Sequence, residues 1–308
     1  MSYIDLSTYQ EYVKKERNRF FETPYNLVYH SFVNLGYDQK EPSYFISNAS
    51  DSVEALRSEC WNRFLPREKE FTSSMLSYLV NENDYLGMTP QESIISFAET
   101  YPDHIYQLSL SNTQSRRARA GKEFEAIIEL ILMGAGVSMD TQGNIGKKIF
   151  VDKGLGKLVD VVSPGVTEYI IDKNDVVLIS AKTTLRERWQ EVPEEMGRTG
   201  AKEMFLATLD ESISDEVLNT LYESNIRITT TRNIKNKCYP NNKRVLDFER
   251  LLEICVKNYE QWTNYDYSLF ERDQMEKAVI LQIEKHIGHD FVVEQLRNRL
   301  KKYKRNND

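Results

Sequence analysis

The sequence is poor in the residues that mark several classes of protein. Its three cysteines, Cys60, Cys238 and Cys255, are odd in number and show no C-x-x-C spacing. This argues against a disulfide framework or a structural zinc site and favours a reducing cytoplasm. No apolar run approaches the length of a membrane span, and the N-terminus lacks the charged and then apolar order of a secretion signal. We therefore expect a cytoplasmic protein with no membrane partner.

The chain also lacks an excess of positive charge, because its formal net charge is -7. Net charge governs long-range behaviour, however, whereas the binding of phosphate groups depends on local clusters of cations. One cluster in residues 114–122 contains three arginines and a lysine, and residues 297–305 are also basic. The acidic balance therefore does not exclude a nucleic acid partner.

No internal repeat, low-complexity tract or Gly/Ser linker divides the chain. At 308 residues it is long enough to bury a sizeable core. We expect one domain over residues 1–308, with a helical N-terminal subdomain over about 1–110. A core follows over about 112–262, and a helical C-terminal extension covers about 263–308.

Apolar periodicity beyond residue 112 predicts an ordered series of helices and strands. The predicted helices cover about 113–133, 189–198, 213–223 and 246–262. The predicted strands cover about 157–162, 167–171, 176–182, 204–209 and 226–229. This order predicts an α/β protein in which helices flank a mixed sheet.

Two residues on the predicted strands suggest phosphodiester hydrolysis. Asp160 lies in an apolar run, where an ionised carboxylate is costly unless it is paired or binds a metal. Lys182 ends another apolar run and could position or deprotonate a water beside a carboxylate-bound Mg²⁺. Taken singly, Asp160 could be an acid on a solvated strand face and Lys182 an edge lysine.

The triplet Arg186-Glu187-Arg188 begins four residues after Lys182. An arginine can bind O6 and N7 of guanine through two hydrogen bonds, and a glutamate can accept from the N4 amine of cytosine. The triplet could therefore recognise two consecutive G·C pairs in the major groove. Surface triplets of this kind are common, but its closeness to Lys182 favours DNA recognition.

The order of helices and strands, with an acid on one strand and a lysine at the end of a later one, resembles the αβββαβ core of the PD-(D/E)xK nucleases. The family's second acid lies two residues before the lysine, and that position is Ser180 here. A hydroxyl is a poor Mg²⁺ ligand compared with a carboxylate. The departure resembles a subset of restriction endonucleases in which a glutamate on the following helix takes this role.

Over about residues 112–230 the sequence resembles type II restriction endonucleases of the EcoRII/NgoMIV-like branch, most closely the SsoII-like enzymes that recognise CCNGG. The resemblance implies catalytic roles for Asp160, Lys182 and Glu195, with Glu125 supporting them. Asp160, Glu195 and Glu125 would then surround Mg²⁺. Glu194 is an immediate rival of Glu195, because neighbouring residues of a helix point in different directions.

The same resemblance implies the reaction, the partners and the base contacts. Arg186, Glu187 and Arg188 would contact bases, and Gln114 would reach the minor groove. The enzyme would be a Mg²⁺-dependent homodimer of the bacterial cytoplasm that cuts double-stranded DNA before the first C and leaves 5′ overhangs. A two-fold dimer with two G·C pairs per subunit requires a palindrome. Whether the central pair is ignored (CCNGG) or restricted (CCWGG), and whether the dimer assembles further on DNA, stays open.

Related enzymes with interrupted sites expel the central base pair from the stack, and a flipped base needs a flat surface. Arg57 and Trp61 are four residues apart on one predicted helix face, and both side chains are planar. The resemblance favours them as the stacking surface, although a Trp buried at a subdomain or dimer contact would have the same spacing.

Two other functions compete with restriction. A structure-specific PD-(D/E)xK nuclease, such as a junction or repair enzyme, would not need the triplet at Arg186 or the long helical N-terminal region. A DNA-binding protein on a decayed nuclease fold would not need Asp160, Lys182 and Glu195 together.

Overall fold

The computed structural model describes residues 4–304, except for the side chains of Glu187, Arg188 and Lys304. These residues form two compact units. The first contains the residues up to Leu27 together with Ser58–Glu123, and the second contains Val28–Arg57 together with the residues from Phe124 onward. Two long helices, α3 (Pro42–Ser77) and α5 (Pro102–Gly134), contribute to both units. The observed α5 begins eleven residues before the predicted helix at 113.

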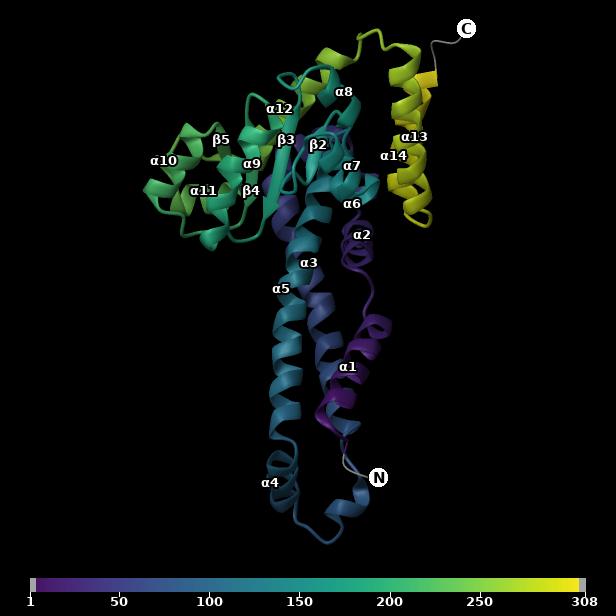
Figure 1. Cartoon of the computed structure of the whole chain (residues 1–308), viewed down its shortest axis with the longest axis vertical. Coiled ribbons are helices and arrows are strands. Elements are labelled where there is room, and N and C mark those ends of the chain that lie inside the picture. The colour runs from purple at the N-terminus through teal and green to yellow at the C-terminus, as the bar shows by residue number, and fades with distance from the viewer. Residues whose placement is uncertain (1–3, 305–308) are drawn as a thin grey trace. The chain divides into compact units, whose positions relative to one another are not determined.

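The first unit is helical (Figure 1). It contains α1 (Leu6–Phe20), a 3-10 turn η2 (Glu82–Tyr85), α4 (Pro90–Thr100) and its shares of α3 and α5. Apolar side chains from α1, α3, α5 and the segments just after α3 and α4 form its core, namely Tyr9, Val13, Phe71, Met75, Leu79, Tyr101 and Leu108. The buried carboxylate of Glu68 on α3 pairs with Arg116 on α5 and joins the two helices.

A six-stranded mixed sheet lies in the second unit (Figure 1). Its strands are β1 (Asp140–Thr141), β2 (Val161–Ser163), β3 (Val177–Lys182), β4 (Met204–Thr208), β5 (Ile226–Thr230) and β6 (Leu246–Asp247). They lie side by side in chain order: β1, β2 and β3 pair antiparallel, and β3 to β6 pair parallel. The predicted mixed sheet flanked by helices is confirmed.

The remaining helices and 3-10 turns lie before, between and after the strands in the chain, and the three longest follow β6. They are α2 (Pro24–Asn34), η1 (Tyr37–Gln39), α6 (Gln142–Ile145), α7 (Lys147–Asp152), α8 (Val166–Ile171), η3 (Arg186–Gln190), α9 (Glu191–Thr199), α10 (Asp215–Glu223), α11 (Arg232–Cys238), α12 (Phe248–Trp262), α13 (Leu269–Lys285) and α14 (Asp290–Lys304). The last two pack against each other as a pair (Figure 1). No helix within residues 4–304 is long and apolar enough to cross a membrane.

One predicted strand is wrong. Residues 167–171, rich in the β-branched side chains that favour strands, belong to helix α8. The N–H of Val166 at the start of α8 donates to Oδ2 of Asp140 at 2.8 Å, so a carboxylate 26 residues earlier caps the helix. A tertiary contact thus overrides the local preference. The first strand of the αβββαβ order is β1, which the sequence pattern did not predict.

Candidate active site

The predicted acid and lysine form an ion pair that is mostly buried. The Nζ of Lys182 lies 3.0 Å from Oδ2 of Asp160, and the two side chains are 14% and 11% exposed. The same Oδ2 accepts from the N–H of Ala181 at 2.7 Å, and Lys182 also donates to the carbonyl of Ala181 at 3.0 Å. Within the described residues both of these donors bind Oδ2 of Asp160, and none donates to Oδ1. One carboxylate oxygen therefore retains its capacity to bind a ligand.

Strand pairing brings these two residues together. Asp160 directly precedes β2, and its N–H donates to the carbonyl of Ile179 on β3 at 2.9 Å. Val161 lies opposite Ile179 in the antiparallel register, so the chain from Asp160 runs back along β3. Because pairing fixes both backbones, the ion pair between them is rigidly placed.

Ser180 occupies the position where related nucleases carry their second acid. Alternation along β3 puts its side chain on the same face as Lys182. The hydroxyl is fully buried and has no hydrogen-bond partner within the described residues. A short neutral side chain here leaves room for an acid from another element.

Glu195 is an acid that could fill this role, because it lies on the buried face of α9 with Val192 and Met196. Its Oε2 accepts from the N–H of Lys157 at 3.0 Å, three residues before Asp160 in the chain. Glu194, by contrast, has a side chain 70% exposed, paired with Arg198. Of the two rivals, it is Glu195 that contacts the segment leading to Asp160.

The oxygen ligands present suit a hard divalent cation. Mg²⁺ is commonly held by one or two carboxylates while it keeps waters and binds substrate phosphate. Asp160 and Glu195 supply two carboxylates, and the bare backbone at Gly156 forms a cradle that a Cβ would fill with a clash against Oε2 of Glu195. Within residues 4–304 no three His, Cys, Asp or Glu side chains are arranged to hold a metal ion. Glu125, half-buried on α5, is thus not brought together with Asp160 and Glu195 as a three-acid site in the described residues, and its role as a third ligand stays a prediction.

The predicted base-contacting triplet lies in η3, immediately after the β3 lysine. Arg186 is exposed and has a left-handed backbone, with φ 44°. This conformation is uncommon for residues other than glycine. The side chains of Glu187 and Arg188 lie outside the described residues. A strained and exposed turn is a common setting for a functional residue.

Asp210, which the sequence analysis missed, holds this turn in place. Its Oδ2 accepts from the N–H of Leu185 at 2.9 Å, and its Oδ1 accepts from the N–H of Ser212 at 3.0 Å. Burial alone would raise the pKa of Asp210, but hydrogen bonds from the backbones of Leu185, Ser212 and Arg186 hold it below its ordinary value. The residue lies 28 positions after Lys182, so local spacing gives no sign of the contact.

The remaining predicted residues lie on the two long helices. Gln114 is exposed on α5, beside a cavity of about 200 Å³ in the first unit. Arg57 and Trp61 are on α3, and the Trp61 side chain is 46% exposed. The guanidinium of Arg116 lies 5.8 Å from the centre of the indole ring, within cation–π range. A large aromatic surface at Trp61 is thus available to a planar ligand.

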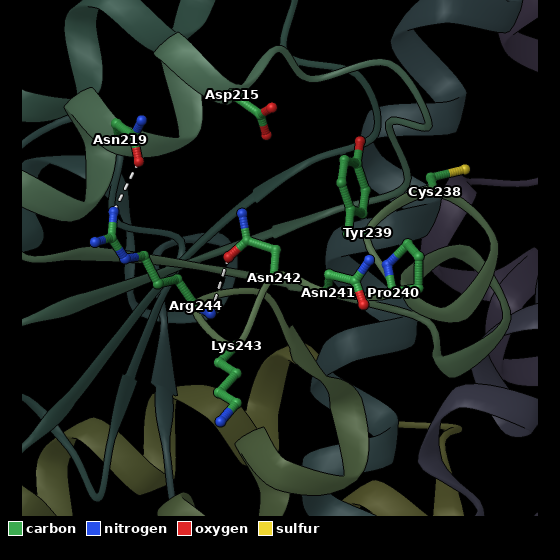
Figure 2. A pocket seen from close by; sticks show the side chains of 9 residues that line it. All are labelled: Asp215, Asn219, Cys238, Tyr239, Pro240, Asn241, Asn242, Lys243 and Arg244. Atoms are coloured by element: carbon green, nitrogen blue, oxygen red, sulfur yellow. Dashed lines mark hydrogen bonds between the residues drawn. The ribbon is translucent and has the colours of Figure 1, made fainter.

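A groove of about 550 Å³ lies beside the loop between α11 and β6 (Figure 2). Arg244 on this loop donates to the side chain of Asn219 at 2.7 Å across the groove. Lys235 and Lys237 on α11 pair with Asp247 and Glu211, each at 2.8 Å. Lys235, Lys237 and Arg244 therefore already have polar partners within the protein.

Comparison with known proteins identifies the family of the chain. Residues 89–252 match the family model described as EcoRII C terminal. The chain is 50% identical over 300 residues to the type II restriction enzyme SsoII of Shigella sonnei, covering 97% of this chain and 98% of the relative. The TM-score to metal-depleted Ecl18kI in complex with uncleaved, modified DNA is 0.93, with 49% identity over 97% of this chain and all of that one.

A more distant match supports the fold alone. The restriction endonuclease PspGI in its substrate DNA complex has a TM-score of 0.58 and 15% identity, covering 78% of this chain and 94% of that chain. By the identity and coverage of the nearer relatives, the chain belongs to the SsoII-like type II restriction endonucleases of the EcoRII C-terminal family.

Proposed function

We propose that the chain cuts double-stranded DNA at CCNGG, before the first C, in a Mg²⁺-dependent reaction that leaves 5′ overhangs. The observation that best supports nuclease chemistry is the buried ion pair of Asp160 and Lys182. Glu195 accepts a hydrogen bond from the segment that leads into Asp160. The named site and cut position rest on the resemblance to SsoII-like enzymes, and the solved relative bound to uncleaved DNA supports DNA as the partner.

Asp160 and Glu195, with Glu125 in support, would hold the metal at this centre. A bound Mg²⁺ would neutralise charge on the scissile phosphate and lower the pKa of a water molecule. The Nζ of Lys182 lies beside Asp160, and this amine group can donate to the attacking water or to the phosphate from a fixed position. Asp160, held by the N–H of Ala181, cannot swing away from the centre.

Base recognition would come from Arg186, Glu187 and Arg188, with Gln114 in the minor groove. An arginine that donates two hydrogen bonds to guanine is the commonest specific contact between a side chain and a base. A homodimer of such subunits contacts a palindrome through its two-fold axis. We propose the dimer as the unit that cuts both strands in the bacterial cytoplasm.

The central base pair would be flipped and stacked on Trp61, with Arg57 beside it. The half-exposed indole supports this role, because stacking of a base on an aromatic ring contributes about 1–3 kcal/mol. The fluorescence of 2-aminopurine at the central position should rise on binding and lose this rise in Trp61→Ala. An unchanged signal in the variant would refute the stacking role.

A plasmid digest tests the proposal as a whole. With Mg²⁺ the purified chain should give discrete fragments whose sequenced ends map to CCNGG, with the break before the first C. Sites with each of the four central bases show whether the enzyme tolerates N or only W. Random degradation, or cleavage restricted to branched DNA, would contradict the proposal, and the second result would favour a junction or repair nuclease.

A further inference from the structure

Gly156 leaves a space that the carboxylate of Glu195 occupies. Its backbone has φ 75°, a left-handed conformation that residues with a side chain seldom adopt. A Cβ placed on Gly156 would overlap Oε2 of Glu195 and would lie 3.4 Å from its Cδ. A side chain at 156 therefore cannot coexist with Glu195 in its observed position.

The carboxylate of Glu195 is held in this space by one backbone group. The N–H of Lys157 donates to Oε2 at 3.0 Å, directly beside the bare Cα of Gly156. Oε1 faces Arg198, one turn along the same helix, at 3.4 Å. The Arg198 side chain is 60% exposed, so the N–H of Lys157 is the more firmly placed of the two contacts.

The turn that carries this N–H is itself fixed from β1 and α6. The side chain of Gln142 donates to the carbonyl of Val159 at 3.2 Å and to the carbonyl of Lys157 at 3.3 Å. Its backbone N–H donates to the carbonyl of Asp160 at 2.9 Å. Glu195 therefore binds the start of a clamped five-residue segment, and Asp160 ends that segment.

We propose that Gly156 is a positioning residue for the cleavage reaction. Its missing side chain and left-handed backbone bring the N–H of Lys157 to Glu195 and set the distance of that carboxylate from Asp160. The proposal rests on the role of Glu195 proposed above. It explains how an acid on helix α9, in place of one at the Ser180 position on β3, keeps a defined distance from Asp160, since both acids are tied to residues 156–160.

Gly154 provides a matched control two residues away. It also has a left-handed backbone, with φ 82°, so an alanine there meets the same kind of backbone strain. The nearest atom to its added Cβ is the hydroxyl of Tyr169 at 3.7 Å, an ordinary contact. The variants Gly154→Ala and Gly156→Ala therefore differ in whether they displace Glu195.

The test measures metal binding separately from cleavage. Ca²⁺ binds through the same kind of oxygen ligands as Mg²⁺, and calorimetry would follow its binding to the full-length protein on a duplex containing CCNGG. Gly156→Ala should weaken Ca²⁺ binding by about 10- to 100-fold, as loss of a supporting contact at a metal site typically does. It should raise the Mg²⁺ concentration for half-maximal cleavage by a similar factor, with metal-free DNA affinity unchanged. Gly154→Ala should match the wild type in all three measurements.

Two further variants separate the possible failures. Asparagine adopts a left-handed backbone more readily than alanine but also adds a Cβ at position 156. The variant Gly156→Asn should therefore fold and still show weakened Ca²⁺ binding. Wild-type Ca²⁺ binding in both Gly156 variants would overturn the positioning role. Glu195→Gln tests the underlying function: if this variant binds Ca²⁺ and cleaves like the wild type, the proposed role of Glu195 fails. If Glu195→Gln is inactive while Gly156→Ala is normal, only the inference about Gly156 fails.

Discussion

Two buried carboxylate–cation pairs differ in whether a carboxylate oxygen stays free of hydrogen bonds: Asp140 on β1 pairs with Arg299 on α14, and Asp160, directly before β2, pairs with Lys182 on β3. Asp140 on β1 bonds the guanidinium of Arg299 at 2.7 Å and the amide of Gln282 at 2.8 Å through Oδ1. Its Oδ2 accepts from the N–H of Val166. At Asp160, by contrast, the N–H of Ala181 and the Nζ of Lys182 both donate hydrogen bonds to Oδ2. The first pair is closed on both oxygens, whereas the second keeps one available.

The surroundings of Arg299 strengthen this contrast. The guanidinium also donates to the carbonyls of Met139 and Pro164 and to the hydroxyl of Tyr303. Burial raises the pKa of the nearby Glu168, although Arg299 opposes that shift. Arg299 thus fastens α14 to the ends of β1 and β2, which is a structural task. A buried acid paired with a cation is therefore a candidate catalytic group only where its coordination is incomplete.

The largest expected effect is on DNA cleavage, which should depend on Asp160 and not on Asp140. Asp160→Asn should lower the single-turnover cleavage rate at saturating Mg²⁺ by about 10³-fold or more, as loss of a central catalytic group typically does. Specific DNA binding should persist, because the variant leaves the η3 turn intact. Quench-flow and gel-shift measurements would give the two values. A rate within tenfold of the wild type would remove Asp160 from the reaction.

Asp140→Asn should instead affect stability. Removing one partner of a buried ion pair leaves an uncompensated charge, here on Arg299, and costs about 3–5 kcal/mol. Urea unfolding would measure the loss. The double variant Asp140→Asn with Arg299→Met should recover part of it, since the orphaned charge is gone. If Asp140→Asn unfolds at the wild-type urea concentration, the closed pair is not the structural anchor that its bonds suggest.

Arg186→Ala should weaken binding to the specific site while cleavage chemistry remains intact in the bound complex. The expected loss is about 1–3 kcal/mol, the usual cost of one base contact. Competition between specific and non-specific duplexes at constant salt would measure it. An equal loss on both duplexes would show that Arg186 contacts backbone phosphate and not a base.

Asp210→Asn should have a smaller effect on the same ratio. The amide keeps one acceptor oxygen but loses the charge that helps bind the N–H groups at Leu185 and Ser212, so specific binding should weaken by about 1 kcal/mol. A duplex competition at the same salt would detect this loss. Full specific affinity in the variant would show that the η3 turn keeps its form without the carboxylate.

A third buried group extends the comparison to pH. Burial, with smaller contributions from His289 and Lys285, lowers the pKa of His286 to about 4 from 6.5. The ring also faces Asn144 at 2.9 Å and Glu129 at 3.6 Å. Because the unfolded chain then binds the proton more readily, stability from this group is present above pH 6.5 and is lost as the pH falls towards 4. The loss is at most about 1.4 kcal/mol per pH unit.

His286→Gln tests this window directly. The unfolding free energy of the variant should depend less on pH than that of the wild type between pH 6.5 and 4. Equal slopes for the two proteins would show that Glu129 compensates the protonated ring.

The sequence predicted most of what local pattern and strand order determine. Apolar runs located β3, β4 and β5 and overlapped the start of β2, and the predicted acid and lysine, Asp160 directly before β2 and Lys182 on β3, form an ion pair. Helix α8 was missed because its cap, Asp140, is distant in the chain. The role of Glu195 was predicted only from the family resemblance. Its contact with Lys157 spans 38 residues, so no periodic pattern in the local sequence indicates it. Asp210, Gly156 and Arg299 act through similarly distant partners, which only the folded chain brings together.

We propose that Asp160, with its open Oδ1, and Glu195 hold the divalent cation, whereas the closed pair at Asp140 does not. Calorimetric titration of Ca²⁺ into protein–DNA complexes of the wild type, Asp160→Asn and Asp140→Asn tests it most directly. At a temperature where all three are folded, the wild type and Asp140→Asn should bind Ca²⁺ with similar affinity. The Ca²⁺ affinity of Asp160→Asn should be at least about tenfold weaker than that of the wild type. Wild-type affinity in Asp160→Asn, or a loss confined to Asp140→Asn, would contradict the account.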